Sequence, residues 1–295
     1  MDHGSTVHRV TALDAMAHAV GPVGPVTITG LGTRGGPVPD ASIVRAPSGV
    51  DWIAPEEMTV GCGAGTPIAE LDAALAERGQ FVAFPLGGTV GGALAVGRSS
   101  VRRLAYGPVR DALLQARVVT ARGEVAKAGG PTVKNVSGFD LCRLLVGSQG
   151  TLAFIGDVIL RTRPLPAVSR WFAGEADPFA LRARLYRPVS ILWDGSTAWV
   201  CLDGHPDDVA EQAALTGLTE VEGPPVLPTG GRASLPPAEL RRLTGRFVAE
   251  VGVGIVHLDD APVPATVDPA AAELHRRLKA EFDPTGRLNP GRSVP

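Results

Sequence analysis

Residues 134–152 read KNVSGFDLCRLLVGSQGTL, and small, turn-forming and apolar residues alternate there too closely for an ordinary buried core. Glycine accepts positive φ and lets the main chain approach a bound group, while short polar side chains form hydrogen bonds at close range. The residues concerned are Gly138, Gly147 and Gly150, with Asn135, Ser137, Ser148 and Thr151. The stretch therefore predicts backbone laid against a large polar ligand.

The composition indicates a folded protein whose partners must be inferred locally. The chain has 295 residues, 44% of them hydrophobic, which is enough for a sizeable core. Its formal net charge of -2 gives no overall field that favours nucleic acid or an anionic membrane surface. The three cysteines, Cys62, Cys142 and Cys201, lie far apart without a C-x-x-C pair, so we expect neither a disulfide framework nor a metal site.

No export signal or membrane-spanning segment is visible, since the first 20 residues have no apolar run and no stretch of about 18 apolar residues occurs. The expected location is the cytoplasm.

Several elements can be placed from local patterns. Residues 26–29 form a β-branched strand that opens into the glycine-rich loop 30–36. The pattern after residue 65 predicts a helix with Thr66 as N-cap, Pro67 at N1 and a stop at Gly79. Strands over 113–120 and 124–128 flank Ala121-Arg122-Gly123, a hairpin connection, and a further strand covers 152–162.

Pro164 and Pro166 close the preceding strand, and the aromatic content of the chain rises after them, which predicts a domain boundary at residue 166. Strands over 190–193 and 197–202 flank the hairpin signal Asp194-Gly195, followed by a helix over 237–251 and a strand over 254–258. A last helix begins with Asp268 as N-cap and Pro269 at N1 and ends at Asp283-Pro284. We therefore expect a domain over 1–166, a small α+β insert over 167–266 and a returning tail over 267–295.

Two loops resemble phosphate cradles, because a pyrophosphate needs converging N–H donors that glycine turns and helix N-termini provide. One is the loop 30–36, and the other is the start of a short helix at Thr89, with Gly91 and Gly92 in its first turn and exposed N–H groups expected. The loop 30–36 lacks the G-x-x-G continuation and the acidic residue about 20 positions on that a Rossmann site requires. A nicotinamide-type site is therefore disfavoured.

Taken together, these segments resemble the FAD-binding fold of the vanillyl-alcohol oxidase family. The similar segments are residues 30–36, 59–65, 89–92, 135–140, 144–152 and 283–292. The stretches 106–111, 134–140 and 274–292 resemble, more narrowly, the FAD-binding subunit of bacterial glycolate oxidases. The resemblance implies an α+β fold, with a PCMH-type FAD-binding domain of two subdomains over 1–166 and a small α+β cap over the flavin.

The resemblance also implies which residues hold FAD. The pyrophosphate would contact Gly30, Gly32, Thr33, Thr89, Gly91 and Gly92. The rest of the dinucleotide would contact Asp111, Gly138, Gly147, Gly150, Thr151 and Ile155, with Lys134 supplying charge nearby and Asn289 closing the site. Asp111 and Asp140 are equally well explained as loop-bracing or N-cap carboxylates, and Ile155 is better explained as strand core.

Many relatives hold the flavin through a His or Cys near the loop 30–36 or the helix at Thr89. This chain has neither residue there, and Cys62 lies outside those positions. Non-covalent FAD is therefore expected.

Oxidation of a 2-hydroxy acid needs a base for the hydroxyl proton and a cation for the carboxylate. The cap contains two histidines, and His257 at a strand end is the candidate base, whereas His205 reads as a turn residue. A lone strand-end histidine is more often structural, so the catalytic residues stay unassigned. Arg102 and Arg103 could face an anionic substrate or a partner, although paired loop arginines are usually solvated.

Three functions remain open. The first is a flavoprotein subunit that oxidises glycolate or lactate and passes electrons to a second FAD-binding subunit and an iron–sulfur subunit, which could hold it at the inner membrane. The second is a non-catalytic or electron-relay FAD-binding subunit of such a complex, which the short cap favours. The third, a flavin reductase of the cell-wall enolpyruvyl-sugar type, lacks a recognisable nicotinamide site or proton donor.

Overall fold

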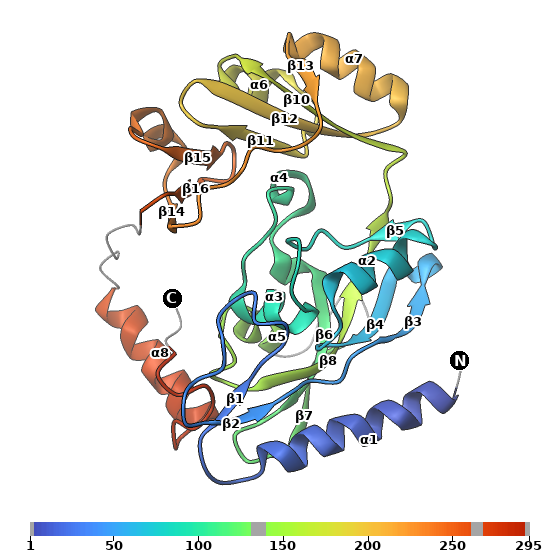
Figure 1. The fold of residues 1–295 in the computed structure, drawn as a ribbon, viewed down its shortest axis with the longest axis vertical. Helices are drawn as coiled ribbons and strands as arrows, with labels where there is room; N and C mark the ends of the chain where they lie inside the picture. Colours follow the sequence, from blue (N-terminus) through green and yellow to red (C-terminus); the bar gives the residue numbers. More distant parts are fainter. Residues whose placement is uncertain (1–2, 131–139, 261–267, 293–295) are drawn as a thin grey trace. The chain divides into compact units, whose positions relative to one another are not determined.

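The computed structural model describes residues 3–130, 140–260 and 268–292 (Figure 1). The chain forms two compact units. Unit 1 comprises Met1–Ser100, Pro108–Leu165 and Val267–Pro295, and unit 2 comprises Val101–Gly107 and Pro166–Thr266. The short excursion Val101–Gly107 thus belongs to unit 2, although it lies within the range 1–166.

Unit 1 is built on a five-stranded antiparallel sheet with strand order β3-β4-β8-β6-β7. Its strands are β3 (Val50–Ala54), β4 (Thr59–Gly63), β6 (Leu113–Val119), β7 (Val125–Gly129) and β8 (Phe154–Arg161). Two small sheets accompany it, a parallel pair β1 (Val26–Ile28) and β2 (Ser42–Val44), and an antiparallel pair β5 (Gln80–Phe81) and β9 (Arg163–Pro164). The helices are α1 (His3–Val20), α2 (Ile68–Ala76), α3 (Val90–Val96), α5 (Leu141–Leu145) and α8 (Pro269–Phe282), with 3-10 turns η1 (Pro55–Glu57) and η2 (Val109–Ala112).

Unit 1 has two hydrophobic cores. The larger core lies between the five-stranded sheet and helices α2, α3 and α5, and includes Leu71, Leu94 and Leu145. The smaller core joins α1, β1 and β2 with Phe154 of β8 and Leu288 of the C-terminal tail. The tail is therefore part of the packing that fixes β1 and the loop that follows it.

The predicted strands and the hairpin of unit 1 are confirmed. β6 and β7 pair in register around Gly123, whose φ of 74° requires the left-handed conformation that glycine accepts. The predicted α8 is also confirmed, since Asp268 caps it by accepting a hydrogen bond from the Ala270 N–H at 2.9 Å.

The predicted N-cap of α2 was wrong. Pro67 occupies that position, and the Thr66 hydroxyl instead bonds Gly49, accepting from its N–H at 2.9 Å and donating to its carbonyl at 3.1 Å. Gly49, which is distant in the sequence, therefore takes the Thr66 hydroxyl that the local pattern assigns to the start of α2.

Helix α1 was missed by the sequence analysis. Its buried side chains are Leu13, Met16, Ala17 and Val20, which follow helical spacing. This apolar stripe was the available signal, and polar residues around it obscured it.

Unit 2 is a seven-stranded antiparallel sheet with strand order β13-β10-β12-β11-β15-β16-β14. The strands are β10 (Val168–Glu175), β11 (Ser190–Trp193), β12 (Thr197–Gly204), β13 (Thr219–Val221), β14 (Gly231–Ser234), β15 (Phe247–Glu250) and β16 (Ile255–Leu258). The helices are α4 (Arg103–Tyr106), α6 (Pro178–Arg184) and α7 (Pro206–Thr216), with the 3-10 helix η3 (Pro237–Arg242). Leu181 of α6 and Val209 of α7 share one buried core with β10, β11 and β12, so both helices cover the same face.

The predicted helix over 237–251 was also wrong. Only η3 forms, and β15 begins at Phe247 after Gly245, whose φ is 81°. All four residues of β15 are buried between β11 and β16, so pairing within the sheet overrides the local helical pattern.

Candidate functional site

A pocket in unit 1 brings together most of the predicted ligand-binding residues. About 760 Å³ of space, part of it open to solvent, lies between the loop after β1, the start of α3, the turn before β8 and the C-terminal tail. The predicted residues that line it are Gly30, Gly32, Thr33, Thr89, Gly91, Gly92, Gly150, Ile155 and Asn289.

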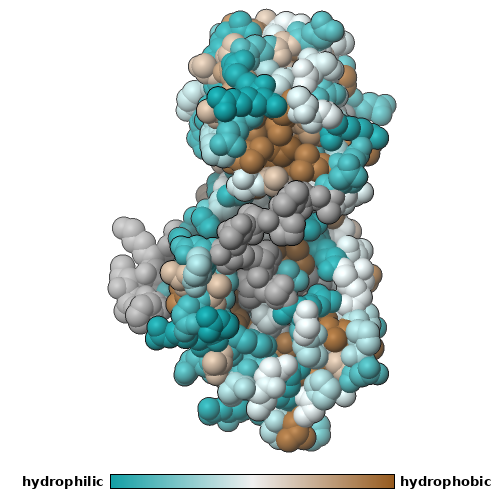
Figure 2. All heavy atoms as spheres, turned by 90° about the vertical axis from the view of Figure 1, so that its left-hand side faces the viewer, coloured by the Kyte–Doolittle hydropathy of each residue, from teal (hydrophilic) through white to brown (hydrophobic). Residues whose placement is uncertain are grey.

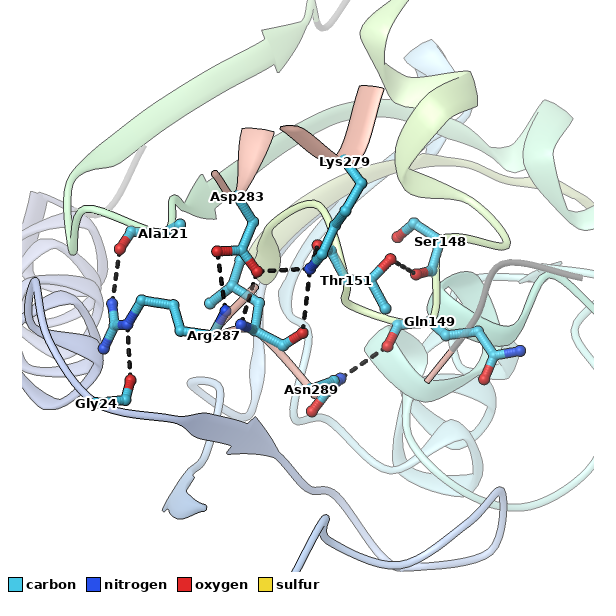
Figure 3. Close-up of polar contacts among 10 residues, drawn as sticks. Gly24, Ala121, Ser148, Gln149, Thr151, Lys279, Asp283, Arg287 and Asn289 are labelled. Atoms are coloured by element: carbon cyan, nitrogen blue, oxygen red, sulfur yellow. Dashed lines mark hydrogen bonds and ion pairs between the residues drawn. The ribbon is translucent and has the colours of Figure 1, made fainter. Parts of the chain in front are cut away.

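Asn289 joins three segments of the pocket wall. Its buried amide oxygen accepts from the Thr27 hydroxyl at 2.8 Å and the Ile28 N–H at 3.2 Å, and its amide nitrogen donates to the Gln149 carbonyl at 2.7 Å. Figure 3 shows the contact with Gln149. A Cβ at Gly150 would lie 2.7 Å from the Asn289 amide nitrogen, so this glycine makes room for the amide. Asn289 therefore holds β1 and the 149–150 turn together.

The tail that carries Asn289 is anchored by two buried charged side chains (Figure 3). Asp283 accepts from the N–H groups of Arg287 and Leu288 at 3.1 and 2.8 Å and pairs with Lys279 at 2.5 Å. The Arg287 guanidinium donates five hydrogen bonds of 2.6 to 2.7 Å to backbone carbonyls. These carbonyls belong to Val20, Gly21, Val23, Gly24 and Ala121.

The hydroxyls of the turn 147–151 do not serve as free donors. Ser148 Oγ donates to the Leu145 carbonyl at 2.8 Å, and Thr151 Oγ1 donates to the Ser148 carbonyl at 2.7 Å. The predicted role of these hydroxyls as hydrogen-bond donors to a ligand was therefore wrong, because Ser148 satisfies the end of α5 and Thr151 satisfies the carbonyl of Ser148. Gly147 and Thr151 line a neighbouring groove against α8 instead of the pocket.

The start of α3 also differs from the prediction. Thr89 is the N-cap, as predicted, and accepts from the Gly92 N–H at 3.2 Å. However, the Val90 N–H donates to the Thr66 carbonyl at 3.0 Å and the Gly91 N–H to the Ala64 carbonyl at 2.7 Å. The expected exposed N–H groups are therefore already bonded to protein atoms.

The charge in the pocket comes from arginine. No Asp or Glu occurs among its described lining residues, which include Arg34 and Arg292. Arg292 donates to the Gly36 carbonyl, whereas Arg34 Nη1 is buried with no hydrogen-bond partner among the described residues. Sequence reasoning missed both residues. For Arg34 the signal was a lone cation inside a glycine-rich loop.

The remaining predicted residues lie elsewhere. Asp111, in η2, is half exposed, 3.8 Å from Arg110, and does not line the pocket. Asp140 stands at the N-cap position of α5 and pairs with Arg143 at 2.8 Å. Lys134 and Gly138 lie outside the described residues.

His257 lies in unit 2, on β16, and is 8% exposed. Its Nε2 is 2.8 Å from Glu250 Oε1 on β15, and Arg232 Nη2 of β14 lies 3.6 Å from the same oxygen. His205 is the N-cap of α7, where Nδ1 accepts from the Asp207 N–H at 3.4 Å.

Arg102 is not a solvated loop arginine. It pairs with Asp203 of β12 at 2.6 Å and donates to Ser169 Oγ at 2.8 Å, within unit 2. Tyr106 also donates to Asp203, and burial together with that carboxylate raises the pKa of Tyr106. The cluster fastens the excursion Val101–Gly107 to the sheet of unit 2.

The three thiols are expected to be inert in the folded protein. Cys62, Cys142 and Cys201 are free and buried, and burial raises the pKa of the Cys142 thiol to about 11 and of the Cys201 thiol to about 12. Because the thiolate is the reactive form, DTNB at pH 8 should release less than about one equivalent of chromophore from the native chain. Unfolding in urea should expose all three. Rapid reaction of the native chain at one site would contradict the buried placement.

Comparisons with known proteins agree with this architecture. A family model described as an FAD binding domain matches residues 14–129, and one described as the C-terminal domain of FAD linked oxidases matches residues 238–293. The chain is 27% identical to the glycolate oxidase subunit GlcE of Escherichia coli over 95% of both chains. It is 42% identical to a D-lactate dehydrogenase of Archaeoglobus fulgidus, but over only 35% of this chain and 24% of that protein.

Solved structures agree on the fold alone. Two crystal structures of alkyldihydroxyacetonephosphate synthase superpose with TM-scores of 0.68 and 0.70 at 14% identity. They cover 95% and 96% of this chain and 74% and 75% of their own.

The fold and the two matched domains define an FAD-linked oxidoreductase with a PCMH-type FAD-binding domain. The chain is similar to glycolate oxidase subunits and D-lactate dehydrogenases. The predicted fold class, family resemblance and FAD cofactor are thereby confirmed. The described residues contain no helix with the length and hydrophobicity needed to cross a membrane.

The unit 1 pocket fits such a cofactor. A pyrophosphate carries negative charge, and the pocket combines an absence of described lining carboxylates with a buried guanidinium nitrogen that has no partner there. Leaving a buried donor of a charged group without an acceptor is costly, so a bound anion would stabilise this arrangement.

Proposed function

We propose that this chain is an FAD-binding subunit that oxidises a 2-hydroxy acid of the glycolate or lactate type. The observation that carries the proposal is the similarity to a glycolate oxidase subunit along 95% of both chains. A match of this extent includes the cap as well as the cofactor domain.

FAD would be held in the unit 1 pocket, with the loop after β1, Thr89 and Asn289 around it. The predicted residues outside this pocket would contact the cofactor less directly or brace the loops. No His or Cys occurs among the described lining residues, which supports non-covalent binding. When bound, the flavin supplies the hydride acceptor for the substrate carbon.

The proton of the substrate hydroxyl would be taken by His257. Arg232 Nη2 lies 3.6 Å from Glu250 Oε1, and the same oxygen lies 2.8 Å from His257 Nε2, where it would accept a hydrogen bond from that ring nitrogen. This leaves Nδ1 as the basic atom of the ring, with Glu250 fixing its orientation.

A second function is favoured by the burial of the same histidine. His257 is 8% exposed and paired, as a structural side chain would be, which suits a relay subunit whose partner performs the chemistry. In both cases we propose that electrons pass to a second FAD-binding subunit and an iron–sulfur subunit, in the cytoplasm or at the inner membrane. Figure 2 shows hydrophobic residues gathered in one patch on the surface of unit 2, and such patches often mark protein contacts.

Anaerobic reduction distinguishes the two functions. When glycolate or D-lactate is added, the chain purified alone with FAD should lose the visible absorbance of oxidised flavin. The variant His257→Gln should slow this loss by about 100-fold or more, since a general base contributes 10²- to 10⁴-fold. A flavin that stays oxidised with every 2-hydroxy acid, but bleaches with dithionite, would support the relay subunit instead.

A further inference from the structure

The pocket needs a source of positive charge that the main chain at α3 does not provide. The Val90 and Gly91 N–H groups donate to backbone carbonyls, and the Gly92 N–H donates to Thr89 Oγ1. An anion at this end of the pocket therefore meets few free backbone donors on α3. Side chains would supply the positive charge that these groups do not.

Arg34 reaches that same end of the pocket from the loop after β1. A Cβ at Gly88, the residue before the Thr89 cap, would overlap Arg34 Nη1 and lie 2.5 Å from Thr33 Oγ1. A Cβ at Gly92, in the first turn of α3, would lie 3.9 Å from Arg34 Nη1. The guanidinium thus sits over the N-terminal turn of α3, in space that only a glycine at position 88 leaves open.

Two other arginines of this region are already engaged. Arg45 Nη1 donates to the Gly30 carbonyl at 3.3 Å, and Arg292 donates to the Gly36 carbonyl. Both brace the loop that carries Arg34. Arg34 Nη1 itself is buried without a hydrogen-bond partner among the described residues.

No carboxylate among the described lining residues compensates this cation. Burial, and then the guanidinium of Arg98, lower the pKa of Arg34, and no acidic side chain occurs among the described lining residues. A guanidinium that is partly buried, repelled by a second cation and short of an acceptor is prepared for an anionic ligand with two or more oxygens.

We propose that Arg34 binds the pyrophosphate of FAD through its side chain, and that Gly88 is required because any larger residue would displace that guanidinium. The proposal rests on the placement of FAD in the unit 1 pocket. It adds to that placement a residue that determines cofactor affinity and the preference for a diphosphate.

The first test measures FAD affinity by titrating the apoprotein and following flavin fluorescence. Arg34→Gln should raise the Kd for FAD by about 10- to 100-fold, as for loss of a hydrogen bond to a charged group. Arg34→Lys should recover part of the affinity. Arg122→Gln is the matched control, since it removes the same charge from an exposed turn outside the pocket, and its Kd should equal that of the unmodified chain.

Competition with fragments of the cofactor shows where the effect acts. ADP should displace FAD from the unmodified chain far better than adenosine does. Arg34→Gln should lower the affinity for ADP and leave the affinity for adenosine unchanged. The salt dependence of FAD binding should also become shallower in this variant, because a charge pair has been removed.

Gly88→Ala tests the second half of the proposal. It should lower the affinity for FAD as Arg34→Gln does. The variant that carries both substitutions should bind FAD no more weakly than Arg34→Gln alone. Gly87→Ala is the matched control, because Gly87 has nearly the same φ, 74° against 75°, but open space where the Cβ would lie.

Each result decides the matter. Equal losses for FAD, ADP and adenosine would show a structural role for Arg34, and an unchanged Kd in Arg34→Gln would exclude the contact; either outcome overturns the proposal. Arg34→Gln and Gly88→Ala could leave a folded chain that binds FAD normally, while Asn289→Ala binds FAD weakly. FAD would then still be placed in the unit 1 pocket, and only the role of Arg34 would be excluded. Failure of the unmodified chain to bind FAD would overturn both.

Discussion

Replacing Arg287 with alanine is expected to lower the free energy of unfolding by about 3 to 5 kcal/mol, the largest loss we expect from a single side chain in unit 1. The Arg287 side chain is 5% exposed and donates all five of its hydrogen bonds to backbone carbonyls. The bonds to Val20 and Ala121 are fully buried, so water cannot replace the lost donor there without rearrangement.

The fork of a guanidinium is essential to this arrangement. Five N–H donors in one plane reach the loop between α1 and β1 and the β6–β7 turn at once, and an ammonium offers only three donors from a single point. Arg287→Lys should therefore recover less than half of the lost stability. Urea unfolding followed by circular dichroism measures both variants.

Arg277→Ala is the matched control, because Arg277 is an exposed residue of α8 and its removal changes the net charge equally. It should change the unfolding free energy by less than about 0.5 kcal/mol. A loss below about 1 kcal/mol for Arg287→Ala would mean that the carbonyls are rehydrated, and the tail would then not be fixed by this side chain.

Arg287 also shows which contacts sequence reasoning could not find. The elements that were predicted correctly have local signals, such as Gly123 in the β6–β7 turn or Asp268 before α8. Arg287 bonds residues about 166 to 267 positions away, and no local pattern encodes such a partner. The same limit explains Thr66, whose hydroxyl is taken by Gly49 across 17 residues.

The candidate site divides in the same way. Its glycines and Thr89 were predicted from the glycine-rich loops, the helix start and the family resemblance, Asn289 was predicted from the resemblance alone, and the pocket contains most of them. How they act was less predictable, since the N–H groups of α3 and the hydroxyl of Ser148 turned out to be bonded within the protein. Composition shows which groups a loop carries, but only the folded chain shows which of them remain available to a ligand.

Asn289→Ala is expected to weaken FAD binding by about 10-fold or more and to lower the free energy of unfolding by about 2 to 4 kcal/mol. The amide makes three side-chain hydrogen bonds and is 1% exposed, so the variant leaves the Gln149 carbonyl and the Ile28 N–H without partners. Both groups belong to walls of the pocket, and their loss of partners should therefore lower the affinity for FAD as well as the stability of the fold.

Backbone strain can be separated from the loss of the side chain. Asn289 has a φ of 45°, which glycine accepts readily and alanine does not, so Asn289→Gly isolates the missing hydrogen bonds. We expect Asn289→Gly to be more stable than Asn289→Ala by about 1 kcal/mol, with an equally weak affinity for FAD. If the glycine variant bound FAD normally, the amide would matter only for folding.

Gly150→Ala should reproduce the effect of Asn289→Ala from the opposite side of the contact. Its Cβ would lie 2.7 Å from the Asn289 amide nitrogen and push the amide away from the Gln149 carbonyl. Gly79→Ala is the control, with a φ of 64° against 68° and nothing within 4 Å of the added Cβ. Both variants strain the backbone alike, but only Gly150→Ala disturbs Asn289. Only Gly150→Ala should therefore lower the affinity for FAD. Equal affinities for the two would mean that the 149–150 turn can move without disturbing the pocket, and that the tail does not shape the cofactor site.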